Sequence, residues 1–204
     1  GDDNHRTMKY VKVLLITLTA IGFICWHISG RVTKFDLPDG ELKWSSVKPT
    51  NAKMFLPAAF TNENGEISGA YRYDGRTYQN GKALKMKVSL KGDTFYISNQ
   101  WLSDNGFQQL TLVYNSKPMK FHDSRKSIRR ALCKDENGAF ILQSDYPMTL
   151  DKFAMECSKH STNATYLDMG EYGYGYIKTN RLIRPLYIWG FFTKHKQTNW
   201  IYIE

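Results

Sequence analysis

The sequence predicts an α+β fold: one mixed, strand-dominated domain with one or two helices, preceded by an N-terminal transmembrane or signal segment. Short apolar stretches separated by glycine-containing turn signals run through most of the chain, which is typical of strands joined by hairpins. The composition, 42% apolar and 14% aromatic over 204 residues, suits one folded domain with its own core.

The N-terminal region contains an uncharged stretch, residues 13–30, which follows the basic residues Arg6, Lys9 and Lys12. This pattern predicts either a retained transmembrane anchor with a cytoplasmic N-terminus or a cleaved export signal. Bulky Trp26 lies where a cleavage site needs small residues, which favours the anchor. A buried strand is the third interpretation, because Val, Ile and Thr are frequent in the stretch.

These features divide the chain into four parts. We expect a basic flank, an anchor or signal segment, a linker and a domain, over residues 1–12, 13–30, 31–47 and 48–204. The basic flank places the domain on the extracytoplasmic side, in the periplasm or at the cell surface, either anchored in the membrane or secreted.

The domain should begin as a meander of short hairpins. Turn signals at Asn64-Gly65, Asp74-Gly75, Asn80-Gly81 and Gly92-Asp93 separate apolar segments. The predicted strands are residues 68–73, 84–89, 94–98, 110–114, 131–133, 139–142, 164–167, 185–192 and 200–203.

One helix is predicted after residue 149. Thr149 is suited to cap its N-terminus, and Asp151 favours its first turn. An apolar stripe at helical spacing is formed by Leu150, Phe153, Ala154 and Cys157. The strand that follows should place Asp168 at its end.

Two of the three cysteines lie in the domain. Cys25 belongs to the apolar N-terminal segment, so Cys133 and Cys157 are the candidate disulfide pair. In an oxidising compartment this bond would stabilise the fold by roughly 3 kcal/mol. Two separate buried thiols are the other interpretation. The cysteines and histidines do not have the spacing of a zinc site, so we expect no metal.

The formal net charge is +9, and residues 1–30 contribute only one of these excess positive charges. A basic domain of this kind favours phosphorylated glycans or anionic lipid head groups as partners, although it is also compatible with a merely soluble basic surface. Nucleic-acid-binding motifs are lacking, so nucleic acid is not an expected partner.

Three segments resemble, in order and spacing, the signature segments of phosphodiester glycosidase-like domains. They are Asn51-Ala-Lys-Met-Phe55, Ile128-Arg-Arg-Ala-Leu-Cys133 and Tyr166-Leu-Asp-Met-Gly170. The similarity covers roughly residues 48–178. It implies hydrolysis of a sugar-1-phosphodiester without a cofactor, as in the enzyme that uncovers mannose 6-phosphate tags.

The resemblance implies catalytic roles for Asp168, Arg129 and Asn51. Asp168 would act as nucleophile or as base for water, Arg129 would bind the phosphate, and Asn51 would orient hydroxyl groups. Each residue also has a plain interpretation: a turn or cap for Asp168, a solvated basic run for Arg129, and a loop residue for Asn51. A second register sets Ala58-Ala-Phe60 on the first motif in place of Asn51.

Five further residues are candidates for substrate binding. Glu171 is a second carboxylate, His122 is a titrating base, and Arg125 lies in the basic run before Arg129. Gly170 belongs to the third segment, and Tyr172 is a candidate for stacking on a sugar ring.

The chain departs from the family pattern at three positions where glycine is expected, which here hold Lys53, Cys133 and Met169. Two main hypotheses follow. The first is an extracytoplasmic, membrane-tethered sugar-1-phosphodiester hydrolase; the second is an inactive carbohydrate- or phosphate-binding or protein-interaction domain on the same fold. A basic structural component at the membrane is a third hypothesis. The hydrolase hypothesis requires that the three catalytic candidates converge on one cleft.

Overall fold

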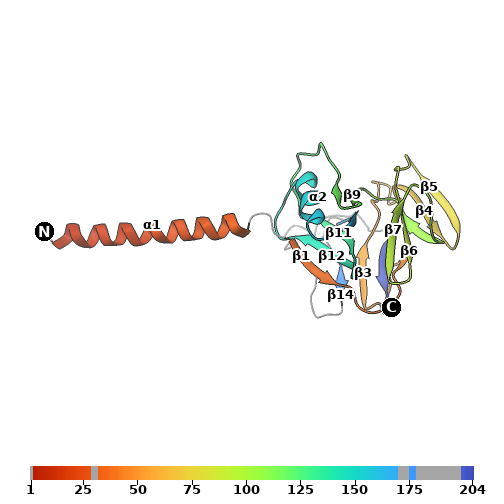
Figure 1. Cartoon of the computed structure of the whole chain (residues 1–204), viewed down its shortest axis with the longest axis horizontal. Coiled ribbons are helices and arrows are strands. Elements are labelled where there is room, and N and C mark those ends of the chain that lie inside the picture. Colours follow the sequence, from red (N-terminus) through yellow and green to blue (C-terminus); the bar gives the residue numbers. More distant parts are fainter. Residues whose placement is uncertain (1, 29–31, 170–174, 178–198) are drawn as a thin grey trace.

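The computed structural model describes residues 2–28, 32–169, 175–177 and 199–204. Within these residues the chain forms two helices and three antiparallel sheets, so the expected strand-dominated α+β class is confirmed (Figure 1). The predicted strand over residues 185–192 lies outside the described residues.

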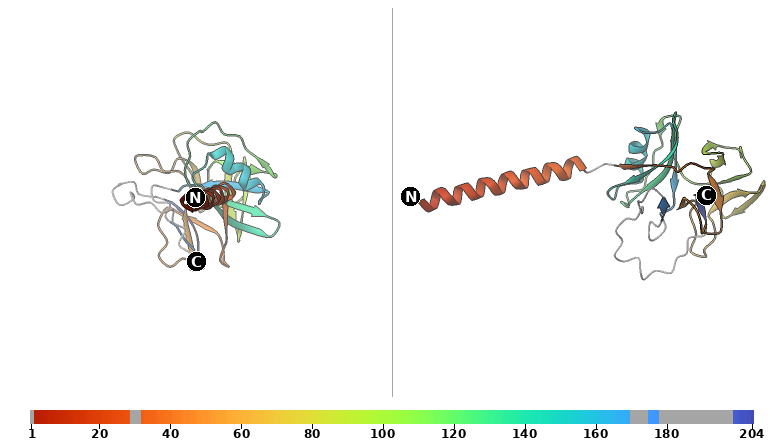
Figure 2. Two further views of the ribbon diagram at one scale, coloured as in Figure 1. Left: turned by 90° about the vertical axis from the view of Figure 1, so that its left-hand side faces the viewer. Right: turned by 90° about the horizontal axis from the view of Figure 1, so that it is seen from below.

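Helix α1, Asp2–Ile28, contains the basic flank and most of the apolar stretch. It extends away from the sheets (Figures 1 and 2), and the side chains from Tyr10 to Gly22 are exposed. The interpretation of this stretch as a buried strand is therefore wrong. The predicted transmembrane anchor gains no support: within the described residues, neither helix combines the length and apolarity that crossing a bilayer requires.

The largest sheet has six strands in the order β1-β12-β11-β13-β9-β10. Their bounds are β1 Val32–Asp36, β9 Thr111–Tyr114, β10 Lys117–Pro118, β11 Arg130–Asp135, β12 Gly138–Ser144 and β13 Asn163–Leu167. The predicted strands at 110–114, 131–133, 139–142 and 164–167 correspond to β9, β11, β12 and β13. Residues 31–47, expected to be a linker, instead contain two strands: β1, which pairs with β12 from Val32↔Ser144 to Asp36↔Phe140, and β2, Lys43–Ser45.

A four-stranded sheet in the order β14-β3-β15-β2 lies between the largest sheet and the third one in Figure 1. Its strands are β2 Lys43–Ser45, β3 Met54–Pro57, β14 Tyr176–Ile177 and β15 Trp200–Ile203. The C-terminal strand β15 pairs with both β3 and β2, which joins the two ends of the domain sequence.

The third sheet has five strands in the order β5-β4-β8-β6-β7. They are β4 Gly69–Tyr73, β5 Arg76–Asn80, β6 Lys87–Lys91, β7 Thr94–Ser98 and β8 Asn105–Phe107. The two predicted hairpins form, but β8 inserts between them, so the order is not a simple meander. Gly106 permits this insertion because a Cβ at that position would overlap the carbonyl oxygen of Val88 on β6.

Helix α2, Leu150–Ser158, packs on one face of the six-stranded sheet. Thr149 caps it as predicted, accepting a hydrogen bond from the Lys152 backbone N–H at 3.3 Å. The buried stripe of α2 packs on the alternate residues Ala131 and Cys133 of β11. The intervening Leu132 faces the main core, which the three sheets enclose together.

Candidate active site

Asp168 lies where two sheets meet. It directly follows β13, and its backbone N–H donates to the carbonyl oxygen of Ala58, 2.9 Å away, just beyond the end of β3. The buried side chain of Gln109 donates to the same oxygen over 3.2 Å. Asp168 is itself partly exposed. The strand end predicted from the sequence therefore carries a carboxylate at a junction between the six-stranded and four-stranded sheets.

Asn199, which sequence reasoning missed, holds the other side of this junction. Its Oδ1 accepts from the Ala59 backbone N–H at 2.7 Å, and its Nδ2 donates to the Ala59 carbonyl oxygen at 3.0 Å. The same Oδ1 accepts from the indole N–H of Trp44 at 3.3 Å. Asn199 is 1% exposed, so these bonds are shielded from water. A single Asn before a strand carries no sequence signal for such a role.

Strands β11 and β13 bring Arg129 and Asp168 next to each other. The register pairs Arg130 with Leu167, so Arg129 and Asp168 are the next residues on the two adjacent strands. Both residues influence the pKa of the Tyr166 phenol. The guanidinium carbon of Arg129 lies 5.8 Å from the centroid of the Tyr166 ring. Burial raises the pKa of the Tyr166 phenol; a hydrogen bond with Arg129 opposes this rise, and the negative charge of Asp168 adds to it.

The guanidinium of Arg129 is engaged with protein groups. It donates from Nε to the Met148 carbonyl oxygen at 3.3 Å, and from Nη2 to the Arg125 carbonyl oxygen at 2.8 Å and to Asp123 Oδ2 at 3.4 Å. Arg129 is 3% exposed, so its interpretation as part of a solvated basic run is wrong. It clamps the loop of residues 121–127 against the start of α2.

The clamped loop presents two predicted binding residues to solvent. The side chains of His122 and Arg125 are exposed. The Arg125 backbone N–H donates to Asp123 Oδ1 at 2.9 Å. This hydrogen bond, followed by the charge of Arg129, holds the pKa of the Asp123 carboxyl below its usual value. The loop therefore keeps Asp123 ionised and leaves Arg125 free to meet an anion.

Arg130 faces the opposite side of the sheet and is fully buried. It donates from Nε and Nη2 to Gln143 Oε1, over 3.1 and 2.9 Å. Gly175 packs against this side chain and Leu56: a Cβ there would overlap Leu56 Cδ2 and lie 3.1 Å from Arg130 Nη1. Burial lowers the pKa of Arg130 to about 9, while Tyr166 and Asp168 oppose this shift. Arg130 is therefore a buried cation that the Asp168 carboxylate stabilises.

Asn51 does not join this group. It is exposed at the opposite end of β3, where the adjacent Lys53 donates from its backbone to Ile203 and from its ammonium to the carbonyl oxygens of Asp39 and Glu204. The extended strand β3 lies between Asn51 and Ala58, and at about 3.3 Å per residue it alone spans roughly 10 Å.

The three catalytic candidates therefore do not converge on one cleft. Arg129 and Asp168 are brought together, whereas Asn51 is not. The segment beside Asp168 is that of the second register: Ala58 accepts its N–H, and the ring of Phe60 packs on Tyr166 at 5.5 Å between centroids.

Three predicted binding residues, Gly170, Glu171 and Tyr172, lie outside the described residues. Within the part of the chain that the structure describes, His, Cys, Asp and Glu side chains form no group that could hold a metal ion. Cys133 and Cys157 are both buried and are present as free thiols.

Comparison with known proteins finds similarity in structure but not in sequence. Neither protein-family models nor curated protein sequences gave a match. Among solved structures, the chain is similar to the catalytic domain of zebrafish N-acetylglucosamine-1-phosphodiester alpha-N-acetylglucosaminidase, auto-inhibited by its pro-peptide. The TM-score is 0.57 at 13% sequence identity, and the match covers 85% of this chain and 81% of that one. At this identity the likeness shows a shared fold and nothing more.

Proposed function

We propose that the chain is a divergent phosphodiester glycosidase-like protein that hydrolyses a sugar-1-phosphodiester at a site centred on Asp168. The three-residue site expected from the sequence does not form, so the proposal excludes Asn51 and relies on the second register, which brings Ala58 and Phe60 to this strand end. The observation that carries the proposal is the position of this partly exposed carboxylate. It lies at a strand end beside Arg129 and Arg130, in a fold shared with a sugar-phosphodiester glycosidase.

Asp168 and Arg130 have separate roles in the proposed reaction. Asp168 acts as nucleophile, or as base for water, and stabilises the positive charge that develops on the sugar. A phosphate monoester leaves readily, so the site has little need of a strong general acid. The buried positive charge of Arg130 attracts the Asp168 carboxylate, whose charge in turn opposes the fall in the pKa of Arg130.

The phosphate contact is assigned to Arg125. Its side chain is exposed on the loop of residues 121–127, whereas Arg129 is 3% exposed and already bonded to protein oxygens. Arg129 then serves as a positioning residue that holds the loop. A guanidinium on this loop offers the planar, bidentate contacts that phosphate oxygens favour.

The test is an assay of sugar release from methyl esters of sugar-1-phosphates, including that of N-acetylglucosamine. Asp168→Asn should lower the rate at least about a hundredfold, because the variant loses the nucleophile or base. Arg125→Ala should raise KM more than it lowers kcat. Matched controls are Asp93→Asn and Arg76→Ala, which change exposed residues of the five-stranded sheet and its turns and should leave the rate unchanged. Equal background rates for the wild type and Asp168→Asn would reject hydrolysis.

A non-catalytic binding domain is the second candidate. Three observations favour it: Asn51 lies far from Asp168, the guanidinium of Arg129 is held by protein groups, and Met169, at an expected glycine position, is 8% exposed. This function predicts that isothermal titration calorimetry detects a sugar-1-phosphate binding to the wild type without turnover. Arg125→Ala should then weaken binding and Asp168→Asn should not.

The extracytoplasmic location stays a prediction. Its support is the basic flank before residues 13–30. A C-terminal alkaline phosphatase fusion tests it, because that enzyme requires the oxidising side of the membrane for its disulfides. An inactive but intact fusion would contradict it.

A further inference from the structure

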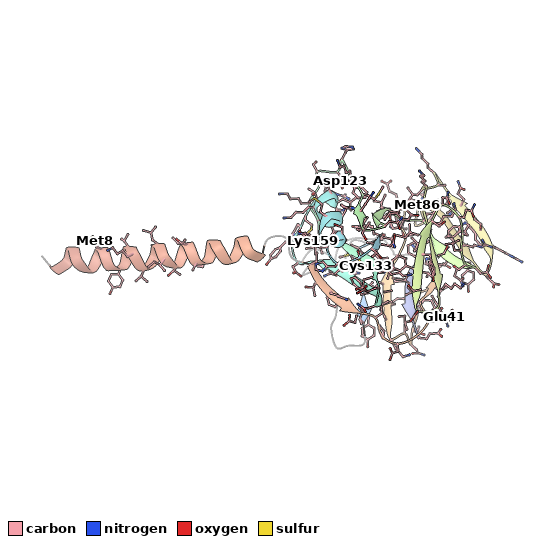
Figure 3. All side chains as sticks on the ribbon, viewed as in Figure 1. Met8, Glu41, Met86, Asp123, Cys133 and Lys159 are labelled. Atoms are coloured by element: carbon pink, nitrogen blue, oxygen red, sulfur yellow. The ribbon has the colours of Figure 1, made fainter. Side chains whose placement is uncertain are left out.

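Cys133 and Cys157 approach each other from different elements. Cys133 lies on the face of β11 that is turned toward α2, and Cys157 lies on the buried stripe of α2. Both are 0% exposed and belong to the same buried cluster, and Figure 3 shows Cys133 in the interior of the domain. The sequence alone left open whether the two thiols are separate, and the structure makes them neighbours.

The chemistry of Cys157 reflects this contact. Burial raises the pKa of its thiol well above the usual range, and a hydrogen bond with the Cys133 thiol raises it further. In the folded protein the Cys157 thiol is therefore held protonated, and burial shields both cysteines from reagents. An exchange reaction, which needs a thiolate, should be slow unless α2 opens.

We propose that Cys133 and Cys157 form a disulfide that ties α2 to the central strand β11 when the chain folds in the presence of a disulfide oxidant such as oxidised glutathione. One thiolate attacks the oxidant and releases one glutathione thiolate. The second cysteine, after losing its proton, displaces the other glutathione and closes the bond. Two protons and two electrons leave the protein, and the oxidant is reduced to two thiols.

The disulfide would restrain the loop of residues 121–127 as well as α2. Asp151 of α2 accepts the Phe121 backbone N–H at 3.1 Å, and Met148, just before α2, accepts a hydrogen bond from Arg129 at 3.3 Å. Both contacts hold the loop of residues 121–127. A covalent tie at Cys157 therefore restrains the loop that carries Arg125, and it does so whether or not the site is catalytic.

The experiment uses the full chain with Cys25→Ser, which removes the third cysteine. The protein is refolded from denaturant in oxidised and reduced glutathione, digested without reduction and mapped by mass spectrometry. We expect linked peptides containing Cys133 and Cys157. Native protein incubated with the same oxidant should form the bond at least about tenfold more slowly, because both thiols are buried.

Stability gives the second readout. Reduction of the oxidised protein should lower Tm by about 10 °C, as expected for a loop of this length in a domain of this size. It should also speed hydrogen exchange in α2 and in residues 121–127. Cys157→Ala, which is incapable of forming the bond, should show the same Tm with and without reductant. Free thiols at both positions after oxidative refolding, or a Tm of the linked protein that reduction does not change, would overturn the proposal.

Discussion

Replacing Asn199 with Ala should destabilise the domain more than any other single amide truncation at the junction beside Asp168. The Asn199 side chain makes three hydrogen bonds, two with the backbone of Ala59 and one with the indole of Trp44. Ala59 is 1% exposed and Trp44 is 2% exposed. Truncation therefore leaves two buried donors and one buried acceptor without their partners.

The size of the effect follows from these three groups. Each buried polar group that loses its partner costs about 1–3 kcal/mol. Water that enters the space of the missing amide restores part of this, so we take values near the lower end and expect a loss of about 4 kcal/mol in the free energy of unfolding. With an m-value of about 2 kcal/mol/M for a domain of this size, the urea midpoint should fall by about 2 M.

Asn62→Ala is the matched control. The Asn62 side chain also accepts two backbone N–H groups, those of Asn64 and Glu66, at 3.0 and 2.9 Å. Asn64 and Glu66 are exposed, so water replaces the lost acceptor. We expect a loss of about 1 kcal/mol or less.

Asn199→Asp separates hydrogen bonding from packing, because the two side chains have nearly the same volume. An ionised Asp would still accept from Ala59 and Trp44, but its second oxygen would face the Ala59 carbonyl oxygen without a proton to donate. The variant should therefore be unstable at neutral pH. If Asn199→Ala lowers the urea midpoint no more than Asn62→Ala does, the reasoning about the buried junction is wrong.

Three further predictions concern neighbouring elements. Arg130→Met should lower stability by about 1–2 kcal/mol in urea titrations, because it removes both donors to Gln143 Oε1 and a cation near the partly exposed Asp168, whereas an unchanged or increased stability would contradict this. Gly106→Ala should prevent formation of the native five-stranded sheet, seen as lost near-UV circular dichroism, because its Cβ overlaps the Val88 carbonyl oxygen; a native spectrum would refute this. Asp123→Asn should lower stability above pH 4 only: the folded pKa of Asp123 lies below the unfolded value of about 3.9, so its contribution is present above that value and disappears as the pH falls through the folded pKa. A difference that persists at pH 2 would contradict this assignment.

The sequence predicted the elements whose ends are set by neighbouring residues, such as turns and helix caps. The strand at 94–98 has the predicted bounds and the helix begins directly after Thr149 as predicted, because a turn and a cap are encoded within a few positions. The strand predicted at 84–89 is observed at Lys87–Lys91, since Leu84 is instead held by the side chain of Gln108.

Long-range pairings explain what the sequence could not show. The region around β1 has the composition of a linker because residues 37–41 include Pro, Asp and Gly. The five residues before this segment, Val32–Asp36, nevertheless form β1 and pair with β12. Likewise, β8 enters the five-stranded sheet between two hairpins that are complete without it. β1 pairs with β12, which begins only at Gly138, and β8 contains Asn105-Gly106, a pair typical of turns. Local signals therefore identify neither segment as a strand.

At the site itself, the sequence does not show on which face of the sheet the side chains of Arg129 and Arg130 lie. Because Ala131, Leu132 and Cys133 are all buried, β11 is apolar on both faces, and its pattern does not indicate which face receives Arg129 and which receives Arg130. The register with β13 decides this: Arg129 reaches the loop on the α2 side, and Arg130 reaches the main core. A carboxylate at the end of β13 thus has a cation on each side of the sheet. Among the described residues, the loop with the exposed Arg125 lies on the Arg129 side, whereas Arg130 is fully buried. Under the proposed function, the phosphate contact and the structural charge balance therefore lie on opposite faces of one strand.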